Sequence, residues 1–261
     1  MSELVRLEKN GPLAWVTLDR PEVMNALSYP TLGRLGEICA ELAEDRDVRA
    51  VLVTGAGEKA FCAGADLKER VDFDEEQTRA FVARIGDTFS AVAGLPQPTI
   101  AVLNGVAYGG GLELALACDM RVAVAGAKMG LTETALAIIP GAGGTQRLPA
   151  VVGIARAKEM ILTARRVDAA EAERIGLVNA VAPPETLRAT AESLAAAIAA
   201  CGPLAVRAAK EAIDLTTGPG DLASNLLRER ALYLERVLPS KDRLEALAAF
   251  REKRKPDYKG E

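Results

Sequence analysis

The chain has no histidine among its 261 residues. Without imidazole, Ser-His-Asp and Cys-His nucleophilic catalysis, histidine metal ligands and imidazole general bases are all excluded. Any acid–base chemistry must therefore come from carboxylates, lysine, tyrosine or cysteine.

Cysteine pairs are also lacking. Cys39, Cys62, Cys118 and Cys201 are scattered, with no CxxC motif and no spacing typical of metal ligands. Cysteines of this kind usually behave as small buried apolar side chains in a reducing compartment. We therefore expect four buried thiols and no metal site.

A basic excess and a long apolar run are missing too. The net charge of -4 and the pI near 5.3 argue against general nucleic-acid binding, which needs a concentrated basic surface. The first 21 residues carry acids from Glu3 onward and no apolar core typical of a signal peptide, and no later stretch has the length of a membrane span. We expect a cytoplasmic protein with neither nucleic acid nor membrane as a partner.

The residues that are present describe an ordinary globular chain. Hydrophobic residues make up 49% and charged residues 26%, which excludes a disordered or fibrous protein. The length indicates one large domain, or one domain with a helical appendage.

Local patterns predict short strands alternating with helices. A hairpin turning at Asn10-Gly11 opens the chain, and apolar spacing predicts a helix from Tyr29 to about Leu42. Further expected elements are strands at 48–55, 98–105 and 120–126, and a helix at 111–117. This order favours stacked β-β-α turns over a long open sheet. From about residue 153 onward the patterns are almost entirely helical, with breaks at Pro183-Pro184 and at 216–221.

Glycine-rich stretches raise the possibility of nucleotide binding. Residues 108–115, YGGGLELA, lack the Gly-Lys-Ser/Thr ending of a P-loop. Residues 141–148, GAGGTQRL, have Gln146 where a dinucleotide fingerprint needs its third glycine. The stretch 55–69 fits neither motif, although its Gly-Ala pair beside a strand end lets a ligand approach the backbone.

Glu113 follows the glycines of 109–111 and precedes an apolar segment. A helix beginning near Gly110 would direct free amides and the positive end of its dipole outward, which makes an oxyanion site. Glu113 would stand beside that oxyanion in the first turn. The alternative is a helix-capping acid that faces water.

Glu133 likewise interrupts an apolar context, twenty residues further on. It can be a surface glutamate on a loop, or it can converge with Glu113 on one polarised carbonyl. Two such carboxylates would suit proton transfers next to that carbonyl, one activating water and the other handling the proton of the α-carbon.

Four segments together resemble the enoyl-CoA hydratase/isomerase family, also called the crotonase family. They are FCAGADLKE, NGVAYGGGLELALACD, GLTETALAIIPGAGGTQRLP and the tail PSKDRLEALAAFREKRKPDYKGE. The resemblance covers essentially the whole chain and is closest to the branch of enoyl-CoA and methylglutaconyl-CoA hydratases.

The resemblance implies an α/β fold, a spiral of ββα units over residues 1–200 followed by a helical trimerisation region over 201–261. Family members assemble as homotrimers, which pair into hexamers. They bind acyl-CoA thioesters, with coenzyme A as part of the substrate and no separate cofactor. The backbone amides of Ala65 and Gly110 match the oxyanion hole.

Glu113 and Glu133 match the two catalytic glutamates of the hydratases. The resemblance therefore implies syn addition of water to a short-chain or branched 2-enoyl-CoA. In this assignment Glu113 activates the water and Glu133 delivers the proton to C2. Alternatives that keep the same oxyanion site are 3-methylglutaconyl-CoA hydration in leucine breakdown, isomerisation and thioester hydrolysis.

The resemblance also assigns a set of residues to coenzyme A. Lys59 and Lys68 match lysines near the nucleotide phosphates, and Ala63 belongs to the same set. Phe250 matches a tail aromatic near the adenine, and Lys253 matches a lysine that reaches the 3'-phosphate of a neighbouring subunit. The charged tail, otherwise typical of a solvated surface, is then partly an inter-subunit binding element.

A non-catalytic RNA-binding homologue is the alternative from another class. The RNA-binding relative carries a row of lysines on its first long helix, whereas TLGRLGEICAELAEDRDVR has five acids and no lysine. Because acidic side chains repel phosphate, RNA binding is not carried over to this chain.

Overall fold

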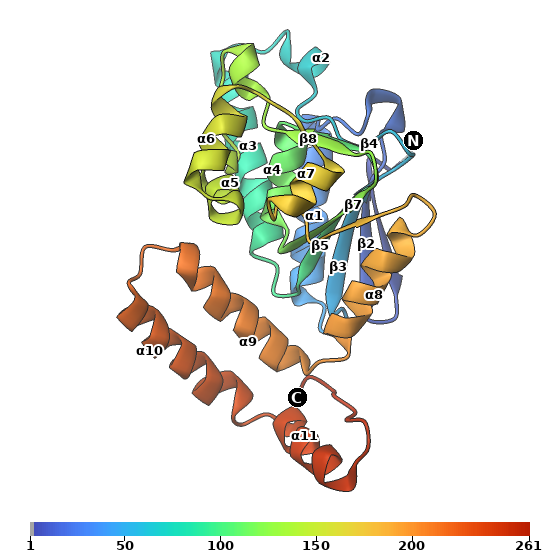
Figure 1. Cartoon of the computed structure of the whole chain (residues 1–261), viewed down its shortest axis with the longest axis vertical. Coiled ribbons are helices and arrows are strands. Elements are labelled where there is room, and N and C mark those ends of the chain that lie inside the picture. The colour runs from blue at the N-terminus through green and yellow to red at the C-terminus, as the bar shows by residue number, and fades with distance from the viewer. Residues whose placement is uncertain (1–2) are drawn as a thin grey trace.

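Two β-sheets organise the chain in the computed structural model, which describes residues 3–261 (Figure 1). The larger sheet has the order β1-β2-β3-β5-β7-β10 and the smaller β4-β6-β8-β9. The strands of the larger sheet are β1 (Val5–Asn10), β2 (Leu13–Leu18), β3 (Ala50–Gly55), β5 (Thr99–Leu103), β7 (Met120–Val124) and β10 (Ala180–Ala182). Those of the smaller sheet are β4 (Ala60–Cys62), β6 (Val106–Tyr108), β8 (Lys128–Gly130) and β9 (Val167–Asp168).

The chain spirals because consecutive strands enter different sheets. β3, β5 and β7 pair in parallel in the larger sheet, while β4, β6 and β8, which directly follow them, pair in parallel in the smaller one. Each turn thus supplies one strand to each sheet before a helix carries the chain to the next turn. The predicted stack of β-β-α turns is confirmed.

The N-terminal hairpin is confirmed as well. β1 and β2 are antiparallel, with Asn10 opposite Leu13 and Val5 opposite Leu18. Gly11 in the turn has φ +56°, a conformation that glycine adopts without a steric penalty.

Helices cover both faces of the larger sheet. The α1/α3 pair lies over one face and closes a core that includes Phe61, Phe81 and Phe89, while α8 lies on the other face over Trp15 and Leu52. The helices before residue 200 are η1 (Pro21–Val23), α1 (Tyr29–Glu44), α2 (Leu67–Arg70), α3 (Glu75–Ala93), α4 (Gly110–Ala117), η2 (Glu133–Leu136), α5 (Gly144–Val152), α6 (Ile154–Leu162), α7 (Ala169–Arg174) and α8 (Leu187–Ala199).

The C-terminal helices extend away from the sheets (Figure 1). They are α9 (Pro203–Asp214), η3 (Leu215–Thr217), α10 (Leu222–Leu232), the π-helical η4 (Tyr233–Val237) and α11 (Lys241–Glu252). α9 is tied to the rest by Lys210, whose ammonium lies 2.8 Å from the carboxylate of Asp119. The division into domains at residue 200 stays a prediction.

Several features differ from the sequence-based expectations. The 19-residue helix α3, begun by a capping box between Asp74 and Gln77, was not expected, and neither were the strands of two or three residues. Strands this short show no resolvable alternation of apolar and polar residues. They form because they pair with distant segments of the chain. The expectation of four buried thiols is wrong for Cys201, which is exposed just after the end of α8.

Within residues 3–261 no single helix is both long and apolar enough to cross a membrane. The bent pair formed by α8 and the segment Pro203–Thr217, with 104° between the two parts, meets the criteria of length and composition only when taken together.

Candidate active site

The turn between β6 and α4 creates the centre of the site. Gly109 there has φ +51° and ψ -126°, and its amide donates to the carbonyl of Gly130 at 2.9 Å. A Cβ at Gly109 would lie 3.1 Å from Oε1 of Glu133. Only glycine therefore fits, both because of its φ and because of the carboxylate beside it.

Two backbone amides converge at this turn. Gly110 begins α4, so its N–H has no partner within the helix. A Cβ at Gly110 would lie 3.6 Å from the nitrogen of Ala65, and one at Gly64 would lie 3.3 Å from the nitrogen of Gly110. Among residues 3–261, neither the Ala65 amide nor the Gly110 amide donates to a backbone or side-chain acceptor. This pair can bind one oxyanion at the positive end of the α4 dipole.

A parallel bridge to the segment before α1 holds the Ala65 amide in place. The amide of Leu27 donates to Gly64 and its carbonyl accepts from Asp66, so Ala65 is fixed from both sides. The carboxylate of Asp66 in turn caps α2 and pairs with Arg20 at 3.0 Å.

Glu113 is buried in the first turn of α4, with 3% of its surface exposed. Its Oε1 accepts hydrogen bonds from the amides of Ala142 and Gly144, both at 2.8 Å. Burial raises the pKa of the Glu113 carboxyl, while the two amides and the positive charge of Arg147 oppose that rise. The alternative of an acid that faces water is therefore wrong.

Glu133 begins η2 and is 8% exposed, so it is not a surface residue. Neither of its carboxylate oxygens has a hydrogen-bond partner within the described part of the chain. Burial, and then the charge of Glu113, raise the pKa of Glu133 to about 7. At neutral pH the two amides and Arg147 thus favour the ionised form of Glu113 against the effect of burial, whereas Glu133, whose pKa is raised to about 7, readily keeps a proton.

The structure brings only part of the coenzyme A set close to this centre. Ala63 lies two residues before Ala65, while Lys59 precedes β4 and Lys68 is exposed in α2. Phe250, 86% exposed, and Lys253 lie on and just after α11, at the opposite end of the molecule (Figure 1). Within one chain these two residues are not part of the site.

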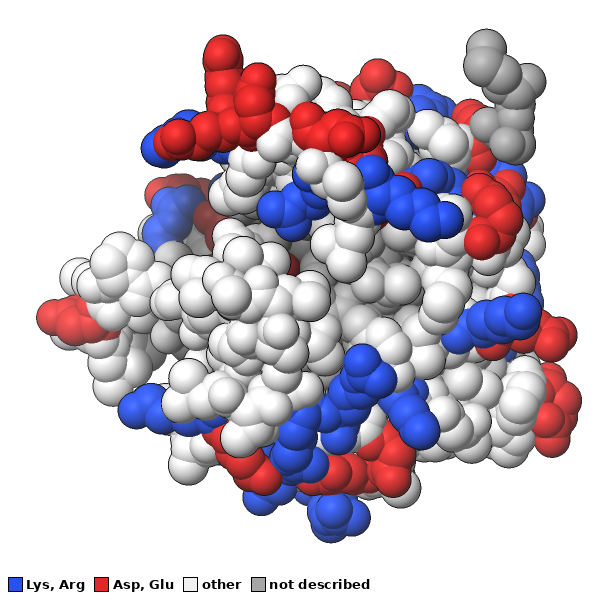
Figure 2. Space-filling view, turned by 90° about the horizontal axis from the view of Figure 1, so that it is seen from above, with Lys and Arg blue, Asp and Glu red and all other residues white. Residues whose placement is uncertain are grey.

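The face seen from above carries uncharged surface across its middle (Figure 2). Around this uncharged middle, Lys and Arg side chains are interspersed with Asp and Glu side chains. This face has no continuous basic surface of the kind that nucleic acids require.

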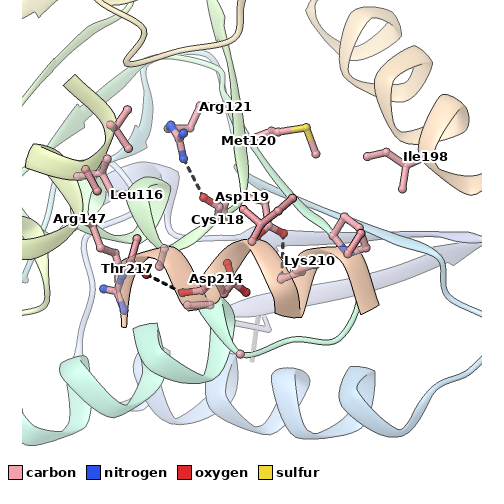
Figure 3. A pocket seen from close by; sticks show the side chains of 18 of the residues that line it. Leu116, Cys118, Asp119, Met120, Arg121, Arg147, Ile198, Lys210, Asp214 and Thr217 are labelled. Carbon is pink, nitrogen blue, oxygen red and sulfur yellow. Dashed lines mark hydrogen bonds and ion pairs between the residues drawn. The ribbon is translucent and has the colours of Figure 1, made fainter. Parts of the chain in front are cut away.

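Another cleft, with a volume of about 1160 Å³, lies between the end of α4 and α9. Figure 3 shows the side chains that line it. Apolar side chains such as Leu116 and Ile198 line it, together with the Asp119–Lys210 ion pair. Glu113 and Glu133 do not line this cleft, so it is separate from the candidate active site.

One contribution to the site was missed by sequence reasoning. The sequence analysis predicts no contact between the stretch 141–148 and Glu113, but two amides of this stretch donate to its carboxylate. The signal was the Gly-Ala-Gly-Gly run itself, because small residues let backbone amides approach an anion closely.

Comparisons with known proteins agree with this geometry. The family model described as Enoyl-CoA hydratase/isomerase matches residues 8–261. A putative enoyl-CoA hydratase/isomerase, YngF, of Bacillus subtilis (strain 168) is 54% identical over 254 residues, which cover 97% of this chain and 96% of the relative. The mitochondrial methylglutaconyl-CoA hydratase of Homo sapiens is 44% identical over 258 residues, which cover 97% of this chain and 76% of the relative. The crystal structure of an enoyl-CoA hydratase from Bacillus anthracis superposes with a TM-score of 0.96 at 50% identity, over 99% of this chain and 100% of that one.

Proposed function

The chain belongs to the enoyl-CoA hydratase/isomerase family, the crotonase family, and from that premise we propose that it adds water to a short-chain or branched 2-enoyl-CoA. It is an enzyme of the enoyl-CoA hydratase family, a hydro-lyase, and the family implies an acyl-CoA substrate.

The observation that carries the proposal is the state of Glu133. Its two buried oxygens have no partner within residues 3–261, although it lies beside Glu113 and beside the turn that carries the oxyanion amides. An unsatisfied buried carboxyl is costly unless a bound group uses it. A water molecule held between two acids, next to a polarised thioester, would supply that group.

In the proposed reaction the thioester oxygen accepts hydrogen bonds from the amides of Ala65 and Gly110. Glu113, ionised, takes a proton from water as the water oxygen forms its bond to C3. The C2–C3 double-bond electrons move toward the carbonyl, and the oxyanion amides stabilise the resulting enolate. Glu133 then gives its proton to C2 on the same face, which completes syn hydration. Loss of one oxyanion donor in enzymes of this type costs about 3 to 4 kcal/mol of transition-state stabilisation.

Both acids favour hydration over isomerisation, because moving a double bond needs one base, whereas hydration needs a second group to activate water. The human relative is named a methylglutaconyl-CoA hydratase, so 3-methylglutaconyl-CoA is the second candidate substrate. A comparison of kcat/KM for the two thioesters separates the candidates.

We also propose that coenzyme A spans two subunits. Lys59 and Lys68 would contact its phosphates from the chain that holds the two glutamates. Phe250 and Lys253 would reach the nucleotide from a neighbouring chain in a trimer or hexamer. Their distance from the site within one chain supports this arrangement (Figure 1).

The test is hydration of crotonyl-CoA, followed as loss of the conjugated-enoyl absorbance. Wild-type protein is compared with Glu113→Gln and Glu133→Gln. We expect each substitution to lower kcat by about 10²- to 10⁴-fold, because each removes a proton-transfer group.

Glu185→Gln is the matched control, since Glu185 is an exposed glutamate remote in sequence from the site. It should keep wild-type turnover. Near-normal turnover in Glu133→Gln would overturn the two-acid mechanism. No hydration of crotonyl-CoA or 3-methylglutaconyl-CoA by the wild type would overturn the proposed function.

A further inference from the structure

Residues 141–144 form a cradle for the carboxylate of Glu113. The amides of Ala142 and Gly144 both donate to Oε1 of Glu113, so the peptide between Ala142 and Gly143 lies between the two donors. A Cβ at Gly144 would lie 3.0 Å from the same oxygen. The backbone of the loop is therefore in direct contact with the carboxylate.

Arg147 holds this cradle through a backbone carbonyl. Its Nη1 donates to the carbonyl of Ala142 at 3.0 Å. That carbonyl belongs to the peptide between the two donating amides. Gly143 has φ +106°, and a Cβ there would meet the guanidinium of Arg147. The loop favours glycine at this position because of its positive φ.

Within the described residues, Glu113 is the one carboxylate whose charge acts on the pKa of Arg147. Burial lowers the pKa of Arg147, while Glu113 opposes that change. A partly buried cation kept next to a bound carboxylate favours the ionised form of that carboxylate.

We propose that Arg147 is a positioning residue for the reaction, which fixes the Ala142–Gly143 peptide and so keeps Glu113 oriented and ionised while Glu133 retains the proton. The proposal rests on the proposed hydratase function, because it divides the roles of the two acids in that reaction. Arg147 itself touches neither acid.

The groups around Glu113 support an asymmetric pair of acids. Arg147 of α5 and Glu133 of η2 are the charged residues that act on it. Arg121 of β7 binds backbone carbonyls at the other end of α4. β4 and β6 contain no charged residue, and the buried face of α3 is uncharged. Glu113 thus has two amide donors and a nearby cation, whereas the charge that acts on Glu133 is that of another carboxylate.

The experiment is the pH profile of kcat/KM for crotonyl-CoA in Arg147→Met. Because Glu113 must be ionised to accept the proton of water, its titration sets the acid limb. Removing the cation should raise the pKa of Glu113 and move that limb upward by about one pH unit. Arg147→Lys keeps the charge, so the acid limb of this variant should differ from that of the wild type by no more than about a third of a pH unit.

A second readout does not depend on activity. With ¹³C-labelled glutamate carboxyls, the Glu113 signal is identified by its loss in Glu113→Gln and titrated by NMR. In Arg147→Met the signal should titrate at a higher pH than in the wild type. Arg156→Met, which removes an exposed arginine of α6, is the matched control and should change neither readout.

If the acid limb and the Glu113 titration are unchanged in Arg147→Met, the proposal is wrong even though the hydratase function stands. If the wild type has no hydratase activity, the NMR titration still decides whether Arg147 controls Glu113. Should Arg147→Met fail to fold, Arg147→Gln carries the same test, because it also removes the charge.

Discussion

At the scale of single residues, two identical side chains differ because of their surroundings. Glu113 accepts two amide hydrogen bonds inside the protein, whereas Glu133 is buried without a partner in the described chain. Hydrogen bonds to a carboxylate favour its charged form, and desolvation favours the neutral form. In the proposed mechanism the same chemical group thereby serves opposite tasks, one as a base and one as an acid.

The raised pKa of Glu133 predicts a pH-dependent effect on stability. Its pKa rises from 4.5 when unfolded to about 7 when folded, so the folded state holds the extra proton between those values. Stability contributed by this group is therefore lost as pH rises through that window. The free energy of unfolding of Glu133→Gln, relative to that of the wild type, should therefore increase by on the order of 1 kcal/mol between pH 6 and pH 8.5.

Chemical denaturation of both proteins at the two pH values measures this gain. Glu185→Gln provides the comparison for an exposed glutamate and should show no pH-dependent difference. If the free energies of unfolding of Glu133→Gln and the wild type differ by the same amount at both pH values, Glu133 does not titrate between pH 6 and pH 8.5.

At the scale of elements, α4 and the turns beside it carry the site. The helix is buried along its whole length, so its N-terminal amides can face a ligand only where the chain enters from β6. Gly109 makes that entry with a positive φ. The oxyanion amides and Glu113 therefore depend on one turn.

Gly109→Ala tests that dependence. The substitution forces a Cβ to within 3.1 Å of the Glu133 carboxylate and into an unfavourable φ. We expect a loss of about 1 to 3 kcal/mol in the free energy of unfolding and a large fall in kcat.

Gly33→Ala in the middle of α1 is the matched control. A Cβ at Gly33 meets nothing within 4 Å, so alanine should stabilise the helix by about 0.5 to 1 kcal/mol and leave kcat unchanged. Denaturant titration and initial rates measure both variants. Equal effects of the two substitutions would show that the turn has no special requirement for glycine.

At the scale of the whole molecule, the C-terminal helices expose many large apolar side chains, which is typical of an interaction surface. The large apolar side chains that remain at least 39% exposed on α10, η4 and the chain through α11 are Leu222, Leu226, Leu227, Tyr233, Leu234, Leu238, Leu244, Leu247 and Phe250. These helices extend away from the sheets, so their own chain does not cover them (Figure 1). In the proposed trimer or hexamer we expect other copies of the chain to bury this surface.

Leu247→Ser with Phe250→Ser should therefore weaken assembly. Sedimentation velocity of the wild type should give a trimer or hexamer, and the double variant should shift toward smaller species as it is diluted. Val71→Ser removes an apolar side chain that is 80% exposed on the far side of the molecule and should leave assembly unchanged. A monomeric wild type would contradict the assembly and, with it, the two-subunit coenzyme A site.

Much of the fold was predictable because its signals are local. The Asn10-Gly11 hairpin, the α1 periodicity and the strand-then-helix order all depend on neighbouring residues. β10 and the smaller sheet were not predictable, because a strand of three residues exists only through its pairing with a distant one. α3 was overlooked although its Asp74/Gln77 capping box is a local signal.

The sequence by itself determined the chemistry that the chain can perform. The absence of histidine leaves carboxylates, lysine, tyrosine or cysteine for acid–base chemistry, the glycine turn and two glutamates twenty residues apart indicate a carboxylate pair beside an oxyanion site, and the long motifs identify the family. Only the tertiary structure decided that Glu113 is bound by Ala142 and Gly144, that Glu133 has no partner within residues 3–261, and that Arg147 donates to the backbone carbonyl of Ala142. The reason is physical, since desolvation and hydrogen bonding depend on groups brought together by parallel strand pairing, which leaves no pattern in the adjacent sequence.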